Sequence, residues 1–165
     1  MAPHQATPPA FDKKACYEKA MIDLEALLEG ETDTIALMAS ISCVLKSHLP
    51  TYYWAGFYIH KNDALIVGPY QGTVGCLHIA MGRGVCGTAA ASLQTVIVEN
   101  VHDFPGHIAC DAATNSEIVV PIRNAENRLI AVFDVDSTFP AAFDTLDQTH
   151  LERMAEVFFR SRALT

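Results

Sequence analysis

The segment Tyr52-Tyr53-Trp54-Ala55-Gly56-Phe57-Tyr58-Ile59 is rich in the aromatic residues that favour β-strands. A polar turn follows it, and the apolar segment 64–68 comes directly after the turn. Two strand-like runs around a short polar turn predict an antiparallel hairpin. The apolar runs 118–122 and 129–136 flank a second polar turn in the same way. The chain is therefore expected to be built on a mostly antiparallel sheet.

Three segments have apolar residues at the spacings of three and four that are typical of amphipathic helices. They are residues 12–29, a segment from Thr32 or Asp33 to Pro50, and residues 145–161. Their apolar positions are Tyr17, Ala20, Met21, Leu24, Leu27 and Leu28 in the first segment; Ile35, Met38, Ile41 and Leu45 in the second; and Leu146, His150 or Leu151, Met154, Val157 and Phe158 in the third.

Further strands are expected at residues 75–80 and 95–98, and a short helix is expected to begin in the glycine-rich segment 82–87. The full order of elements predicts an α+β fold: six mostly antiparallel strands with helices packed mainly on one face. With 165 residues, half of them hydrophobic, the chain is expected to form one domain over residues 12–165, preceded by a disordered tail at 1–11.

Charge and hydropathy indicate which kinds of molecule the protein is expected to bind. The formal net charge is −8 and no Lys/Arg cluster is present, so nucleic acid and anionic membranes are unfavourable partners. No apolar run approaches the eighteen or so residues needed to span a bilayer, and the first eleven residues do not resemble a signal peptide. We expect a cytoplasmic protein that acts on small molecules or proteins.

The chain contains five cysteines, an odd number that argues against a structural disulfide framework. Cys16 and Cys43 lie in helical patterns and are predicted to be buried reduced thiols. The other three follow or precede glycine, histidine or aspartate outside the long helices, where a thiol is more often exposed and activated. They are Cys76, Cys86 and Cys110.

The segment 101–117 has neither strand nor helix periodicity, yet it carries two histidines, a cysteine, two aspartates and a glutamate. A loop of this length in a small domain is usually functional or disordered. Phe104, Ile108 and a Pro-Gly turn argue against disorder. We interpret the segment as an active-site loop around Cys110.

Three acidic residues, Glu117, Asp134 and Asp136, lie at the start of or within apolar strand patterns. Asp134 and Asp136 share one face of a strand, because side chains alternate with a period of two. A solvated sheet edge would explain them without any function. If Glu117 lies beside them in a concave site, the like charges would raise one pKa and keep that carboxyl protonated, as a proton donor. The cluster would also bind an ammonium group.

Trp54, Gly56 and Tyr58 alternate onto one face of their strand. They are either part of the core or two walls of a pocket in which Gly56 leaves room for a methyl group. The glycine-rich segment 82–87 lacks the spacing of a P-loop and is expected to form a tight turn at a helix start. Alternatively, its backbone N–H groups receive a ligand carboxylate. The cysteines and histidines show no zinc-type spacing, so no metal is expected.

Several motifs, in this order along the chain, resemble those of the free methionine-(R)-sulfoxide reductases, a family of GAF-domain proteins. They are Trp54-Ala55-Gly56-Phe57-Tyr58, Gly68-Pro69-Tyr70-Gln71-Gly72, residues 82–90 (GRGVCGTAA), residues 101–111 (VHDFPGHIACD), Asn115-Ser116-Glu117-Ile118-Val119 and Asp134-Val135-Asp136-Ser137. The resemblance covers roughly residues 12–163, and other GAF domains do not carry the three cysteines in these contexts.

The resemblance implies a GAF fold, a homodimer, and reduction of free methionine (R)-sulfoxide without a cofactor, with thioredoxin as reductant. It implies that Cys110 attacks the substrate, that Cys76 resolves the product, and that Cys86 is auxiliary or a rival nucleophile. Glu117, Asp134 and Asp136 would hold the substrate ammonium and assist proton transfer. Trp54 and Tyr58 would surround the methyl group.

On this hypothesis, Cys110 attacks the sulfur while Glu117 or Asp134 protonates the sulfoxide oxygen, which leaves Cys110 as a sulfenic acid. Cys76 then condenses with it to a disulfide. The main alternative is a non-catalytic GAF sensor that binds a small ligand or reports oxidation through its cysteines.

Overall fold

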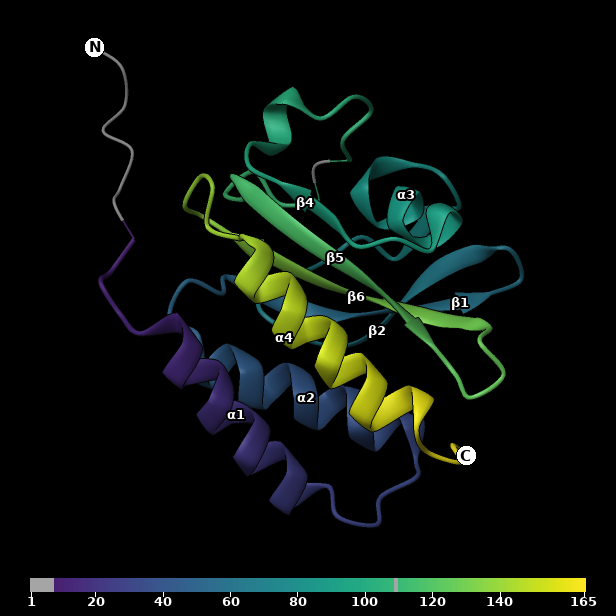
Figure 1. The fold of residues 1–165 in the computed structure, drawn as a ribbon. Helices are drawn as coiled ribbons and strands as arrows, with labels where there is room; N and C mark the ends of the chain where they lie inside the picture. The colour runs from purple at the N-terminus through teal and green to yellow at the C-terminus, as the bar shows by residue number, and fades with distance from the viewer. Residues whose placement is uncertain (1–7, 109) are drawn as a thin grey trace.

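The computed structural model describes residues 8–108 and 110–165, and all of its strands belong to one six-stranded sheet (Figure 1). The strand order is β3-β2-β1-β6-β5-β4, and neighbouring strands pair antiparallel. The strands are β1 (Trp54–Lys61), β2 (Ala64–Gln71), β3 (His78–Ala80), β4 (Val96–Val98), β5 (Ser116–Arg123) and β6 (Leu129–Ser137). This confirms the predicted α+β fold.

Three helices cover one face of the sheet, and the short helix α3 lies on the other (Figure 1). The helices are α1 (Lys13–Leu27), α2 (Thr34–His48), α3 (Gly84–Ser92) and α4 (Thr145–Ala155), and α4 continues in a π-helical turn, Glu156–Arg160. A short 3-10 turn, Val101–Asp103, follows β4. Of the predicted tail at 1–11, residues 1–7 lie outside the described residues.

Aspartates at the helix starts explain where the three long helices begin. Asp12 accepts from Ala15 N, and Asp33 accepts from Ala36 N, so each satisfies a backbone N–H that the helix leaves free. Asp144 forms a capping box with Asp147 at the start of α4. These helices pack their apolar faces on the sheet and form the larger core.

The sheet has two differently occupied faces because side chains alternate along each strand. Phe57, Phe133 and Val135 point into the core under α1, α2 and α4. Trp54 and Tyr58 point to the opposite face, where α3 packs. Figure 1 shows the long loop after β4 on this second side, close to α3.

Some sequence predictions are wrong in detail. Leu27 and Ile35 are 61% and 52% exposed, because they lie beside the buried stripes of α1 and α2 rather than within them. In α4 the prediction left His150 or Leu151 open, and Leu151 is the buried one, whereas His150 stacks on Tyr17 with ring centroids 4.8 Å apart.

Two thiols and one strand also differ from expectation. Cys43 is exposed and Cys16 only partly buried, because neither lies on the buried stripe of its helix. The strand expected at 75–80 is confined to β3, His78–Ala80. Within the described residues, no helix is both long and apolar enough to cross a membrane.

Candidate active site

A cavity lies on the α3 side of the sheet, and every part of the chain that bears a predicted site residue contributes to it. Its walls come from β1, β3, β5, β6, the segment between β2 and β3, the start of α3 and the loop after β4. The lining includes Trp54, Tyr58, Gly75, Cys86, His107, Cys110, Asp111, Thr114, Glu117, Asp134 and Asp136. The cavity therefore gathers seven of the eight predicted site residues. Cys76 joins them through a covalent bond to Cys110.

Strand register brings the three carboxylates together. Glu117 of β5 pairs with Asp136 of β6, and Val119 pairs with Asp134. Glu117 and Asp134 are therefore diagonal neighbours on the same face of the sheet. Both are 5% exposed, so the alternative of a solvated sheet edge does not hold for this pair.

Burial shifts the proton equilibria of the carboxylates towards the neutral form. Loss of solvent, and then the charges of Asp134 and Asp136, raise the pKa of Glu117 well above its usual range. Burial also raises the pKa of Asp134 to about 7, against hydrogen bonds from its neighbours that oppose the shift. For Asp136, burial and the Asp134 charge raise the pKa, and a hydrogen bond with Thr114 lowers it. The cluster therefore retains protons at a pH where exposed carboxyls have lost theirs.

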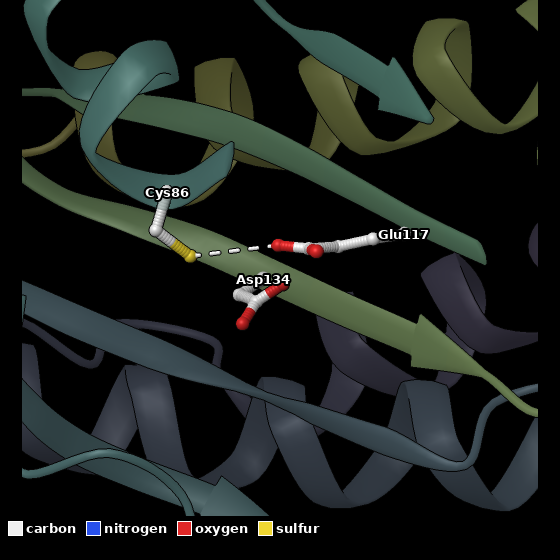
Figure 2. Close-up of side chains that lie close together, drawn as sticks. All are labelled: Cys86, Glu117 and Asp134. Atoms are coloured by element: carbon white, nitrogen blue, oxygen red, sulfur yellow. Dashed lines mark hydrogen bonds between the residues drawn. The ribbon is translucent and has the colours of Figure 1, made fainter. Parts of the chain in front are cut away.

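Figure 2 shows the side chains of Cys86, Glu117 and Asp134 close together. The Cys86 thiol donates to Glu117 Oε1 over 3.8 Å. Burial, followed by the negative charges of Asp134 and Glu117, raises the Cys86 pKa well above its usual value. Cys86 is thus held as a thiol rather than a thiolate, so it is a poor nucleophile in this state.

One oxygen of the carboxylate cluster has no partner. Among buried side-chain atoms of the described residues, Asp134 Oδ1 is without a hydrogen bond. A buried acceptor left unpaired costs about 1–3 kcal/mol, and such a group usually has a ligand or water to bind. The oxygen belongs to a side chain that lines the cavity, where a cationic donor from a ligand would satisfy it.

Cys76 and Cys110 form a disulfide with their Cα atoms 5.3 Å apart. These are the two cysteines that the family resemblance pairs. Cys110 is exposed and lines the cavity, whereas Cys76 is partly buried in the segment between β2 and β3. The bond joins two loops that are distant in sequence at the mouth of the site.

Trp54 and Tyr58 form a wall of the cavity and stack with ring centroids 5.8 Å apart. The proposed methyl pocket at Gly56 is wrong. A Cβ at Gly56 would lie 2.2 Å from Tyr70 Cβ and 2.8 Å from an atom of Trp54. The space is filled by these two side chains, which themselves stack at 5.1 Å. Gly56 serves close packing of the wall and leaves no room beside it.

The glycine-rich segment forms a tight turn into α3, as predicted. Gly82 and Gly84 have positive φ values of 75° and 60°, which favour glycine. A Cβ at Gly87 would lie 2.4 Å from the backbone oxygen of Ala80, so this position also demands glycine. Arg83 precedes the helix without a side-chain cap. A helix gives its first N–H groups no intrahelical partner, and those of α3 lie at Gly84, Val85 and Cys86, which line the cavity.

The two loop histidines differ in their surroundings. His107 Nε2 lies 3.7 Å from Glu117 Oε2 in the cavity wall. Burial lowers the pKa of His107, and the neighbouring His102 lowers it further. His102 is exposed and contacts Asn115 Oδ1 at 3.3 Å. Only His107 of this pair reaches the carboxylates.

Sequence reasoning missed two contributors. Thr114 is 4% exposed and hydrogen-bonds Asp136, and a lone threonine in an irregular loop gives no signal of this. Asp111 accepts hydrogen bonds from Thr73 and Tyr53. Its place directly after Cys110 was the one available hint.

The cluster also has the composition of a metal-ligand set. One ligand atom from each of Cys86, Glu117 and Asp134 lies within 4.8 Å of the others. Sequence spacing does not reveal this set, because its members come from α3, β5 and β6. Cys76 and Cys110 cannot add to it while they are bonded to one another. In the described residues the three groups satisfy one another only in part, since Asp134 Oδ1 has no hydrogen-bond partner.

Comparison with known proteins gives concordant matches. The GAF domain family model matches residues 45–158. The free methionine-R-sulfoxide reductase of Escherichia coli (strain K12) is 45% identical over 144 residues, covering 87% of each chain. The enzyme of that name from Saccharomyces cerevisiae is 37% identical and covers 92% of this chain and 88% of its own.

A solved structure of the free methionine-R-sulfoxide reductase of Neisseria meningitidis, in complex with its substrate, superposes with a TM-score of 0.85. It is 39% identical, and the match covers 94% of this chain and 93% of the other. The chain therefore belongs to the GAF-domain family, in the group that includes the free methionine-R-sulfoxide reductases.

Proposed function

We propose that this protein reduces free methionine (R)-sulfoxide to methionine. The observation that carries the proposal is the cavity itself, in which the disulfide-forming Cys110 lines the same space as the proton-retaining pair Glu117 and Asp134. Sulfoxide reduction needs an acid and a thiol together, because the sulfur is electrophilic only when its oxygen is protonated or strongly hydrogen-bonded. The activity printed for the E. coli and S. cerevisiae relatives agrees with this chemistry.

Each part of the amino acid has a matching group in the cavity. The unpaired Asp134 Oδ1, with Glu117 and Asp136, offers acceptors for the substrate ammonium. The free N–H groups at the start of α3 suit its carboxylate, as backbone donors and helix dipole both favour an anion. Trp54 and Tyr58 provide the apolar wall for the methylsulfinyl end.

In the first chemical step, the Cys110 thiolate attacks the sulfoxide sulfur. Glu117 or Asp134 gives its proton to the sulfoxide oxygen, and that oxygen passes to Cys110 as the S–O bond of the substrate breaks. Methionine leaves, and Cys110 remains as a sulfenic acid. Two electrons have moved from the cysteine sulfur to the substrate sulfur, and the carboxyl group has lost one proton.

Cys110 is a better candidate nucleophile than Cys86. Cys110 is exposed and forms a disulfide with a neighbouring loop. Cys86 is 4% exposed, and burial beside carboxylates raises its pKa, which keeps it as a thiol. We assign Cys86 an auxiliary role next to Glu117.

In the second step, the Cys76 thiol condenses with the sulfenic acid of Cys110, and water leaves. The Cα separation of 5.3 Å lies within the range that a disulfide spans. We propose that thioredoxin then reopens the bond by thiol–disulfide exchange, so that no cofactor is required. A homodimer and a cytoplasmic location, where thioredoxin keeps thiols reduced, complete the proposal.

Selectivity for the free amino acid follows from the buried acidic cluster. A peptide-bound residue lacks the α-ammonium that would pair with Asp134 and its neighbours. Buried polar groups left without their partner reject such an analogue strongly. The same cavity should therefore discriminate against methionine sulfoxide within a polypeptide.

A coupled assay tests the proposal directly. NADPH consumption is followed with thioredoxin, thioredoxin reductase and either epimer of free methionine sulfoxide, and an N-acetylated, amidated derivative serves as control. We expect turnover with the free R epimer, and none after Cys110→Ser. Methionine formation with dithiothreitol but not with thioredoxin would overturn only the reductant. No methionine with either reductant would overturn the enzyme assignment and favour a redox or small-molecule sensor.

A further inference from the structure

The side chain of Asp111 connects three separate segments next to the disulfide. Thr73 Oγ1 donates to Asp111 Oδ2 over 2.6 Å, and the Tyr53 hydroxyl donates to the same oxygen over 3.0 Å. The backbone N–H of Ala113 donates to Oδ1 over 2.8 Å. One partly buried carboxylate thus accepts three hydrogen bonds, two of them from other parts of the chain.

The hydrogen bonds of Asp111 connect the segments that carry the two disulfide-forming cysteines. Asp111 directly follows Cys110, and Thr73 lies in the segment between β2 and β3 that contains Cys76. The Trp54 indole donates to the Thr73 backbone oxygen over 2.9 Å. This second bond holds the Cys76 segment against β1, so the carboxylate attaches the Cys110 loop to an anchored segment.

We propose that Asp111 is a positioning residue that holds the Cys110 loop against the Cys76 segment for the resolving step. The inference rests on the function proposed above. In that step the sulfenic acid of Cys110 reacts with the Cys76 thiol. The new S–S bond forms, the S–O bond breaks, and hydroxide leaves as water with the proton of Cys76.

The chemistry of the carboxylate suits this task. An ionised aspartate has only acceptor sites, so it can take three donors at once. The hydrogen bond from Thr73, followed by those from Ala113 and Tyr53, lowers the pKa of Asp111 and keeps the group ionised. An asparagine would replace one oxygen with an NH₂ group that cannot accept. It would lose either the Ala113 bond or both bonds between segments.

The clamp formed by Asp111, Thr73 and Tyr53 acts on resolution and leaves the first step to other groups. Attack by Cys110 depends on the thiolate and on the proton from the buried carboxylates. Resolution depends on two sulfurs from different loops meeting within bonding distance. Misplacement by about 1 Å can slow a reaction by about 10²-fold. Loss of the clamp should therefore slow disulfide formation and leave the rate of methionine release nearly unchanged.

A single-turnover experiment measures this separation. Reduced full-length protein is mixed with free methionine (R)-sulfoxide without reductant and quenched at intervals. Methionine is quantified, dimedone traps the sulfenic acid, and mass spectrometry quantifies the Cys76–Cys110 disulfide. For Thr73→Val and Tyr53→Phe, which each remove one donor to Asp111 Oδ2, we expect methionine release within about twofold of wild type and disulfide formation slowed by about 10- to 100-fold. The dimedone adduct should accumulate on Cys110.

Two control variants isolate the role of the hydroxyl. Thr73→Ser keeps the donor and should restore disulfide formation, which a purely steric role of the Thr73 methyl group would not. Thr149→Val removes an exposed hydroxyl that donates to Thr145 O on α4, away from the cavity, and should match wild type in both steps.

The outcomes distinguish the clamp from the reductase proposal. Wild-type rates of disulfide formation in both Thr73→Val and Tyr53→Phe would overturn the clamp while the reductase activity stands. Methionine release slowed as much as disulfide formation in Thr73→Val would also overturn it, because the Thr73–Asp111 contact would then serve the first step. No methionine from the wild-type protein would overturn the proposed function, and the clamp with it.

Discussion

Replacing Asp134 with asparagine should stabilise the fold at neutral pH while it removes substrate binding. Burial raises the pKa of Asp134 to about 7, from an ordinary value of 3.8. Below pH 3.8 the carboxyl is protonated in both folded and unfolded chains. As the pH rises towards 7, the unfolded chain loses this proton and the folded chain keeps it. Stability therefore falls over this window and stays low above it.

The size of the effect follows from the same two values. At about 1.4 kcal/mol per pKa unit, the difference between 3.8 and about 7 corresponds to about 4 kcal/mol. The side chain is only 5% exposed, so solvent screens little of this. Asparagine cannot ionise, and it also removes a negative charge that raises the pKa of Glu117. We expect the free energy of unfolding of the variant to be about 2–4 kcal/mol higher than that of wild type at pH 8. At pH 4 the two values should lie within about 1 kcal/mol of each other.

Urea unfolding of the disulfide form, followed by circular dichroism at both pH values, measures the difference. Glu29→Gln, at an exposed carboxyl, is the matched control and should show no such change. Free methionine (R)-sulfoxide should raise the melting temperature of the wild type but not of Asp134→Asn. The claim that burial raises the pKa of Asp134 is refuted if the variant is less stable than wild type at pH 8. It is also refuted if the difference in free energy of unfolding between the two proteins is the same at pH 4 and pH 8.

Three further changes test other parts of the structure. Gly87→Ala should lower the free energy of unfolding by about 2 kcal/mol in urea, because its Cβ would meet the Ala80 oxygen at 2.4 Å; an unchanged midpoint would contradict the tight turn. Lys13→Met should lower the free energy of unfolding in urea by about 3 kcal/mol at pH 7, since Lys13 Nζ lies 2.6 Å from the buried Asp147 carboxylate, which it would leave unpaired; an unchanged midpoint would contradict this. Cys86→Ser should form methionine at more than about a tenth of the wild-type rate in the single-turnover assay, because burial holds the Cys86 thiol protonated and it does not attack the substrate. Complete loss of methionine formation would instead make Cys86 the attacking group.

Local patterns were sufficient to predict the sheet and the acidic face. Alternation along 129–136 places Asp134 and Asp136 together whatever their partners are, and polar turns between apolar runs define the two hairpins. The starts of α1 and α2 also depend on nearby residues, since Asp12 and Asp33 cap these helices. These features depend on residues a few positions apart.

The contacts across the site could not be read in this way. The Cys86–Glu117 bond requires α3 to lie over β5, and the Asp111–Thr73 bond requires two loops to meet. Gly56 shows the same limit, because the space it leaves is taken by Tyr70, which is distant in sequence. Periodicity states which face a residue occupies. It does not state what occupies the space opposite.

The two faces of the sheet divide stability and chemistry between them. Along β6, Phe133 and Val135 enter the helix-covered core, while Asp134 between them enters the cavity. A shift of register by one residue would place the carboxylate in the core and expose the apolar residues, so packing on the helix side enforces the alignment of the acidic cluster. The same packing offsets the cost of burying carboxylates and an unpaired acceptor on the other side. The acidic cluster, which we propose binds the substrate, is thus aligned by an apolar face on the other side of the sheet.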